Sequence, residues 1–184
     1  HDRQTKTTTR VSVSSQGEQG NKDSSMPSIS ADGRFVAFHS KAFNLVDGDT
    51  NGTSDIFIHD RETGETTRVS VSSLGGEGDS NSYYPSINAD GQIVAFYSGA
   101  SNLVMDDTNE YEDVFIHDRL TGETTLVSKS SEGEQGNYYS NLPSISADGN
   151  TVAFESSASN LVSVDTNDTN DIFIHNRQTG ETTR

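Results

Sequence analysis

Three acidic loops contain the residues best suited to chemistry, because their carboxylates and amides are spaced to hold a hard cation. In the first loop, Asp47 to Asp55, oxygen-bearing side chains stand at alternate positions. A tight loop of this kind can wrap one ion that takes about six to eight oxygen ligands. Its opening residues match the start of an EF-hand loop, but Ile58 stands where that loop needs a bidentate Glu. The pattern therefore predicts a calcium site of a different kind.

The two later loops keep the centre and the final Asp of this pattern but lack its first acid. Having fewer ligands, they are weaker candidates than the first loop. The alternative is a solvated loop in which Asp and Asn make local turns. The predicted metal ligands are Asp47, Asp49, Asn51 and Asp55 in the first loop, Asp107, Asn109 and Asp113 in the second, and Asp165, Asn167 and Asp171 in the third.

Four histidines recur at one interval, which raises the question of a shared metal centre. They are His1, His59, His117 and His175. Equivalent side chains on successive packed sheets lie about 10 Å apart, whereas a Zn–N bond is about 2 Å long. One metal could reach two of them only if all pointed to a common axis. We therefore predict a structural residue at a strand end, with a neighbouring repeat as one potential hydrogen-bond partner.

No residue pattern predicts catalysis. Asp32, Asp90 and Asp148 recur in Ala-Asp-Gly, where turn formation accounts for them. The chain has no cysteine and no Gly-x-Ser-x-Gly motif. An active site needs one unique constellation, whereas these residues are copied along the chain. We therefore expect that the chain is not an enzyme and has no catalytic or cofactor-binding residues of its own.

Two tyrosine pairs, Tyr83-Tyr84 and Tyr138-Tyr139, stand beside Gly/Ser-rich segments. Exposed aromatic pairs can stack on sugars or become buried in a protein interface. Packing just before a strand is the commoner explanation for such residues.

All of these residues belong to a unit that recurs every 58 residues, with Pro27, Pro85 and Pro143 opening the same phrase in each copy. A fixed period in this range indicates one supersecondary unit copied in tandem. One such unit buries too little apolar surface alone, so neighbours must share a core. The predicted divisions are 1–26 (last strands of a preceding blade and a linker), 27–84, 85–142 and 143–184, the last with a truncated outer strand.

Within one unit the pattern predicts four short antiparallel strands, at 27–30, 35–38, 55–58 and 66–71, with turns at 31–33 and 61–64. No segment shows helical periodicity. Four short strands per unit are typical of a blade of a β-propeller. The predicted fold is therefore all-β, with propeller-like tandem blades: three full blades and a partial one.

Three phrases of the repeat carry a resemblance to a known family. They are Ala-Asp-Gly-(Arg/Gln/Asn)-x-Val-Ala-Phe, Asp-(Ile/Val)-Phe-Ile-His and Arg-x-Thr-Gly-Glu-Thr-Thr. Together they resemble the TolB-type, WD40-like propeller repeat over essentially the whole chain, although a 58-residue unit is long for that family. The acidic loop is similar to the calcium loops that join strands in integrin-type propellers. The resemblance implies a fold and is nearly silent on activity.

The composition limits the classes of partner that the chain is suited to bind. A formal charge of −16 argues against nucleic acid, because phosphate binding needs clustered Lys and Arg. No run of 18 apolar residues predicts a membrane span. The chain begins and ends at the same phase of the repeat, at His1 and His175, and we expect a processed form, a fragment or a window on a longer array.

Closed propellers usually have about four to eight blades, so three blades leave two faces uncovered. The first hypothesis is thus a non-catalytic, exported bacterial repeat protein of the cell surface or extracellular space. It would be stabilised by calcium and associate with copies of itself or with further blades, for example as a subunit of a fibre. The alternatives are an accessory propeller of a larger hydrolase or peptidase, and a module that binds a glycan or peptide through the tyrosines.

Overall fold

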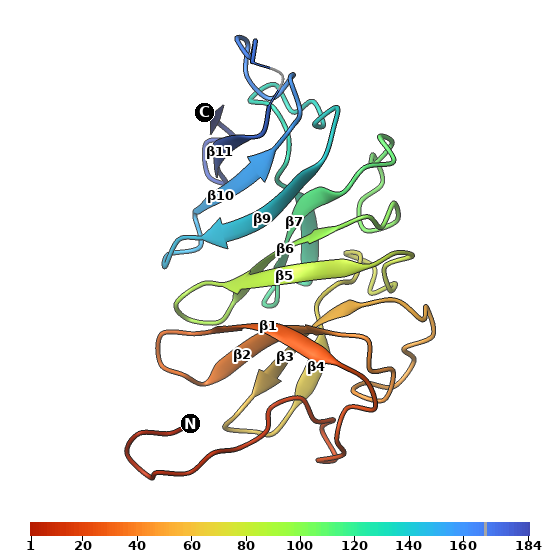
Figure 1. Ribbon diagram of the computed structural model, residues 1–184, viewed down its shortest axis with the longest axis vertical. Helices are drawn as coiled ribbons and strands as arrows, with labels where there is room; N and C mark the ends of the chain where they lie inside the picture. Colours follow the sequence, from red (N-terminus) through yellow and green to blue (C-terminus); the bar gives the residue numbers. More distant parts are fainter. Residues whose placement is uncertain (168) are drawn as a thin grey trace.

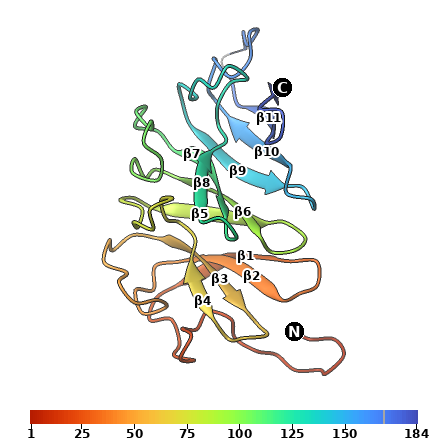
Figure 2. The same ribbon diagram turned by 180° about the vertical axis from the view of Figure 1, so that it is seen from behind.

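The computed structural model describes residues 1–167 and 169–184, and in it three four-stranded antiparallel sheets stack along the chain (Figures 1 and 2). The order within each sheet follows the sequence, so every connection is a hairpin-like turn or loop. The first sheet contains β1 (Ser24–Ile29), β2 (Phe35–Ser40), β3 (Asp55–Asp60) and β4 (Thr66–Arg68). The second contains β5 (Ser82–Ile87), β6 (Ile93–Ser98), β7 (Asp113–Asp118) and β8 (Glu123–Leu126). The third contains β9 (Ser140–Ile145), β10 (Thr151–Ser156), β11 (Asp171–Asn176) and β12 (Thr182–Thr183).

The described residues contain strands and turns but no helix, so the all-β prediction and the four-stranded blade are confirmed. None of them forms a helix long and apolar enough to cross a membrane. The predicted boundaries differ in each strand of the first sheet, and the second and third strands run two residues further than predicted, to Ser40 and Asp60. The first strand begins at Ser24, ahead of the proline, and the fourth ends at Arg68, because Val71 instead makes an isolated bridge to Glu77.

A bulge in the first strand of every sheet accounts for the earlier start. The register of β1 against β2 shifts between Ser25 and Ser28, and the equivalent shift occurs in the other two sheets. The bulged residue takes a positive φ although it is not glycine: Met26 at 49°, Tyr84 at 51° and Leu142 at 49°. The bulge lets the strand keep pairing across a proline that offers no N–H.

Residues 1–26 were expected to contain the last strands of a preceding blade, and here the structure differs. No strand precedes Ser24, and the one pairing is an isolated bridge between Val13 and Gln19. A strand needs a neighbour, and residues 1–10 meet no sheet edge in the described part of the chain. The division of the chain into blades at 27, 85 and 143 stays a prediction.

The hydrophobic core lies between the sheets. Ile56 and Ile58 of the first sheet are buried in one cluster with Phe96 and Phe115 of the second. The second and third sheets form an equivalent cluster that includes Phe154. Each sheet therefore shares part of its hydrophobic core with a neighbouring sheet, as the repeat predicted.

The packed contact between two successive sheets is called a joint below. The joint between the first two sheets is close-packed at one glycine. The Arg119 guanidinium lies 4.5 Å from the centroid of the Phe35 ring. Gly91, in the turn before β6, has φ of +77°, and a Cβ built on it would lie 2.2 Å from an atom of the same ring. Only glycine fits both the backbone conformation and the space.

Candidate functional site

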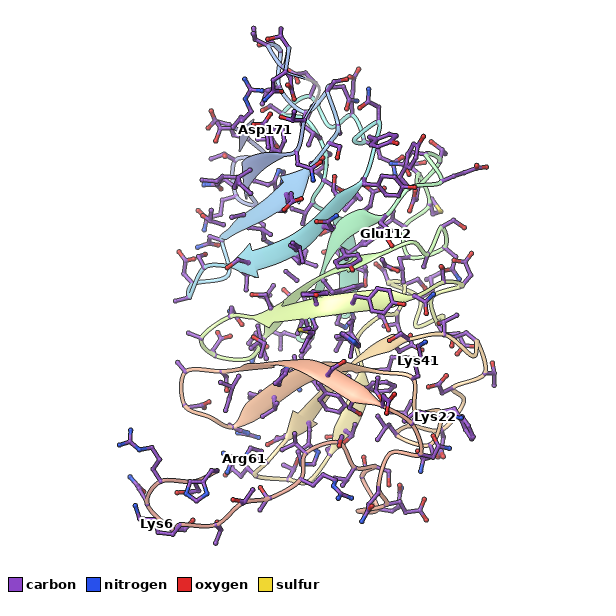
Figure 3. The ribbon with its side chains drawn as sticks, in the orientation of Figure 1. Lys6, Lys22, Lys41, Arg61, Glu112 and Asp171 are labelled. Atoms are coloured by element: carbon purple, nitrogen blue, oxygen red, sulfur yellow. The ribbon has the colours of Figure 1, made fainter. Side chains whose placement is uncertain are left out.

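The acidic loops connect the second and third strands of each sheet, and the last Asp of each loop is the first residue of β3, β7 or β11. Figure 3 labels Asp171, at the start of β11. In the first loop, Asn51 donates from Nδ2 to Asp55 Oδ2 (3.0 Å) and to Gly78 O (2.9 Å), while its Oδ1 accepts from the Thr53 amide (2.9 Å). Ser70 Oγ donates to Asp55 Oδ1 (2.6 Å). The Asn side chain therefore closes a local turn and holds the carboxylate at the start of the strand.

An arginine from the outer strand stands among the carboxylates of this first loop. Arg68 Nη1 lies 2.9 Å from Glu77, 3.5 Å from Asp49 and 3.7 Å from Asp55. Burial raises the pKa of Asp49 to about 6, the Asp55 carboxylate adds to the rise, and Arg68 opposes it. Asp47, the first residue of the predicted ligand set, is exposed. The positive charge that these buried carboxylates need comes from the chain itself.

The second loop has the same carboxylates without the arginine. Leu126 takes the place of Arg68 in the repeat, and Gln135 takes the place of Glu77. Gln135 Nε2 donates to both carboxylates, at 2.7 Å to Asp107 and 2.8 Å to Asp113. Burial raises the pKa of Asp113 to about 6. Two acids thus face each other across one neutral amide.

The third loop returns to the arrangement with arginine. Arg184 Nη1 lies 2.8 Å from Asp165 and 3.0 Å from Asp171, and Asn167 Nδ2 donates to Asp171 (3.0 Å). Arginine, leucine and arginine therefore stand at one phase of the repeat, and each arginine lies close to the two Asp side chains of its own loop.

The structure thus brings two acids of each predicted ligand set to one shared partner: Asp49 and Asp55, Asp107 and Asp113, and Asp165 and Asp171. No group of three or more His, Asp or Glu side chains among the described residues is arranged to hold a metal. Sequence reasoning missed Arg68, Arg184 and Gln135, although Arg68 and Arg184 stand at one phase of the repeat and Gln135 stands at the phase of Glu77. Calcium in these loops stays a prediction.

The repeated histidines are structural, as predicted, but their partner lies in the same sheet rather than in a neighbouring repeat. The Nδ1–Oγ1 distance is 2.9 Å between His59 and Thr66 and 2.9 Å between His117 and Thr124. His175 and Thr182 repeat the contact at 2.8 Å. The Asp of each Ala-Asp-Gly phrase also has a structural role, since Asp32 Oδ1 accepts from the Arg34 amide at 2.9 Å.

One serine and one histidine do meet as a nucleophile and base would. Ser25 Oγ lies 2.8 Å from His39 Nε2, a pair that sequence reasoning did not single out. The other ring nitrogen, His39 Nδ1, is buried and has no hydrogen-bond partner among the described residues. A hydrolytic triad needs an acid at that nitrogen to orient the ring and stabilise its charge. The pair lacks this third member.

The tyrosines form two clusters near the starts of the first strands. Tyr83 and Tyr84 gather with Tyr97 and His39 across the joint between the first two sheets. Tyr138 and Tyr139 gather with Tyr111, with ring centroids 4.6–4.9 Å apart. Tyr138 and Tyr139 stay exposed, and Glu112, labelled in Figure 3, follows Tyr111 in the loop before β7.

The comparisons with known proteins identify the fold. TolB from Acinetobacter baumannii superposes with a TM-score of 0.54 at 18% identity, covering 90% of this chain and 32% of that one. A putative TolB from Agrobacterium tumefaciens gives 0.56 at 18% identity, with 88% and 48% covered. The β-propeller domain of the trilobed protease from Pyrococcus furiosus gives 0.52 at 13% identity, with 90% and 43% covered.

These likenesses show a TolB-like β-propeller fold, so the resemblance read from the repeat is confirmed at the level of fold. The chain spans between a third and a half of the length of these three structures. No protein-family model matches the chain, and no curated protein matches it either.

Proposed function

We propose that the chain is a non-catalytic structural module of propeller blades that works outside the cell and associates with further blades like its own. The observation that carries this is the use of the recurring polar side chains. The histidines bond to threonines, the turn Asp residues bond to backbone amides, and the loop carboxylates bond to Ser, Asn, Arg or Gln. Each unit uses its reactive groups to hold its own shape.

Two further features support this proposal. The Ser25–His39 pair has no orienting acid, so the described residues offer no complete triad. The charge of −16 suits a highly hydrated surface. A surface of this kind favours a scaffold or a fibre component over a binder of polyanions.

Light scattering and electron microscopy across a range of concentrations test the proposal. One chain has a mass of 19.8 kDa, and we expect particles of two or more chains that grow with concentration. A mass of 19.8 kDa at every concentration would contradict the proposal.

The cluster of Tyr111, Tyr138 and Tyr139 favours a second function, recognition of a glycan or peptide. Three rings meet at one edge and two of them are exposed, which suits stacking on a sugar face. Neither of the other units has tyrosine at these three positions. Binding of a neutral polysaccharide that is lost in Tyr138→Ala/Tyr139→Ala, and retained in the Tyr83→Ala control, would support this function.

An accessory role beside a hydrolase is the remaining alternative. The propeller domain of the trilobed protease and the acylaminoacyl peptidase from Pyrococcus horikoshii, which gives a TM-score of 0.52 at 14% identity, share this fold. That likeness concerns the fold and leaves the scaffold as our first proposal. A hydrolase domain in the same polypeptide would favour the accessory role.

A further inference from the structure

The outward face of the third sheet exposes side chains that the other two sheets bury. Ile172 is 60% exposed and Ile174 is 46% exposed. Their equivalents Ile56 and Ile58 are 0% and 1% exposed, and those in the second sheet are similarly buried. The first two faces are covered by the following sheet. The third sheet thus offers the same apolar surface without a cover.

The backbone amide and carbonyl of Ile172, at the edge of this sheet, also lack the partners that their equivalents have. In the first sheet, the Ile56 carbonyl accepts from the Val69 amide (2.8 Å) and its own amide donates to Ser70 Oγ (3.0 Å). Val114 makes the same two bonds in the second sheet, to residues 127 and 128. Over residues 1–167 and 169–184, Ile172 has neither partner. An edge with free donors and acceptors is a template for pairing with another chain.

The Asp171 carboxylate, at the start of β11, lacks the serine hydroxyl that donates to its equivalents in the other two sheets. Ser70 donates to Asp55 in the first sheet (2.6 Å), and Ser128 donates to Asp113 in the second (2.5 Å). Asp171 is met by Asn167 and Arg184 but, in the part of the chain that the structure describes, by no hydroxyl. In the first two sheets these bonds come from the Val-Ser pair that follows the outer strand, Val69-Ser70 or Val127-Ser128.

The opposite end of the chain carries that pair. Val11-Ser12-Val13 repeats Val69-Ser70-Val71 at the same phase. The Val13 carbonyl accepts from Thr66 Oγ1 (2.6 Å), as the Val71 carbonyl accepts from Thr124 Oγ1 (2.5 Å). The segment therefore already lies on the first sheet as its copy lies on the second. Its other side is half-buried and faces no preceding sheet.

The first sheet also exposes the matching apolar residue. Ile29 is 58% exposed, whereas its equivalent Ile87 is 8% exposed and lies in one cluster with Ile56 and Ile58. In that joint the Ile87 amide donates to Ser28 Oγ (3.2 Å). The next joint repeats the bond from Ile145 to Ser86 (3.1 Å). The two ends of the chain thus carry the two halves of an interface that the chain forms twice internally.

Building on the self-association proposed above, we infer that the first unit of a second copy docks on the outward face of the third sheet. Ile29 of the second copy packs against Ile172 and Ile174. Its Val11 amide donates to the Ile172 carbonyl. Its Ser12 hydroxyl accepts from the Ile172 amide and donates to the Asp171 carboxylate. The apolar contact copies the one that Ile87 makes across an internal joint, and the polar contacts copy those that Val69 and Ser70 make at the edge of their own sheet.

Residues 1–10, the N-terminal arm, stand at the same phase of the repeat as residues 175–184. In the proposed joint both segments would need the same place, so the arm of the second copy must move away from it. In the structure the arm contains no strand and is mostly exposed, so little structure is lost when it yields this place (Figure 1). The joint is head to tail, so its repetition closes a ring or extends a filament.

A complementation experiment tests the joint. Ile174→Asp and Ile29→Asp each spoil one half of it, and both side chains are exposed, so both variants should fold. Sedimentation velocity should show self-association weakened by about 100-fold or more in each, because an unpaired charge would be buried. An equimolar mixture should form a dimer and nothing larger, since each variant keeps the half that the other lost. Leu120→Asp places the same charge on an exposed turn outside the proposed joint, so this variant should associate as the wild-type protein does.

Two results would overturn the inference. If Ile174→Asp and Ile29→Asp associate like the wild type, the chains meet through another surface, and only the proposed function stands. If each variant is monomeric and their mixture is monomeric too, the halves are not complementary. A wild type that stays monomeric would instead defeat both proposals.

Discussion

In the first acidic loop a guanidinium stands among three carboxylates, and the second loop shows how the same site is built without it. Arg68 and Glu77 are replaced together by Leu126 and Gln135, whose amide donates to both Asp side chains. The two arrangements solve one electrostatic problem, the burial of a pair of acids. At the residue scale this exchange allows a direct test.

Arg68→Leu should destabilise the fold by about 3 kcal/mol or more, because it leaves buried carboxylates without their cation. Arg68→Leu/Glu77→Gln should recover at least about 1 kcal/mol of that loss, since it copies the second loop. Urea unfolding of the single and double variants measures both. A double variant no more stable than Arg68→Leu would contradict this account of the site.

The calcium prediction is tested by the melting temperature with calcium and with EDTA. We expect calcium to raise it and the chelator to lower it. Asp107→Ala should remove most of this response and Asp49→Ala less, because the first loop already holds Arg68. Identical melting with and without chelator would rule out calcium as a stabiliser.

His175 should make the fold sensitive to acid. Burial lowers its pKa to about 4, and the nearby Lys129 and Arg177 add to the shift. The unfolded chain, with a His pKa of about 6.5, then binds more protons than the folded one between these values. Stability should therefore fall as the pH falls through this window, by up to about 3 kcal/mol for this residue. His175→Gln should show a shallower loss between pH 7 and pH 4 in urea unfolding, and an unchanged slope would contradict the assignment.

At the element scale, the joints between sheets depend on turns as much as on strands. Gly91→Ala adds a methyl group that would lie 2.2 Å from the Phe35 ring, in addition to the strain of a positive φ. Gly122→Ala carries the same strain, at φ of +76°, with open space around it. We expect the control to cost about 1 kcal/mol and Gly91→Ala about 1–3 kcal/mol more. Equal losses in urea unfolding would mean that this turn does not pack against the first sheet.

The sequence predicted the elements better than the contacts between them. The period, the apolar runs and the Gly turns are local signals, and they placed the first residues of the second and third strands of each sheet correctly. Arg68 could not be placed beside Asp49 in the same way, because the outer strand and the loop meet only through the register of the sheet. The bulge before each proline was missed since it needs a partner strand to be defined.

At the scale of the whole molecule, each of the first two sheets has its apolar face covered by the next sheet. The internal joints bury apolar faces and pair edge groups, and the third sheet presents the same face uncovered. If copies join head to tail as we propose, the joint can repeat and give either a closed ring or a filament.

Hydrogen exchange at two equivalent amides tests this claim most directly. The Val114 amide donates to Ser128, which follows the outer strand of the same sheet, whereas the equivalent amide of Ile172 lies at the open edge of the third sheet. We predict that Val114 is protected at every concentration, and that Ile172 exchanges fast in dilute samples and becomes protected as chains associate. A slow Ile172 amide in the monomer, or a fast one in the assembled protein, would contradict the account.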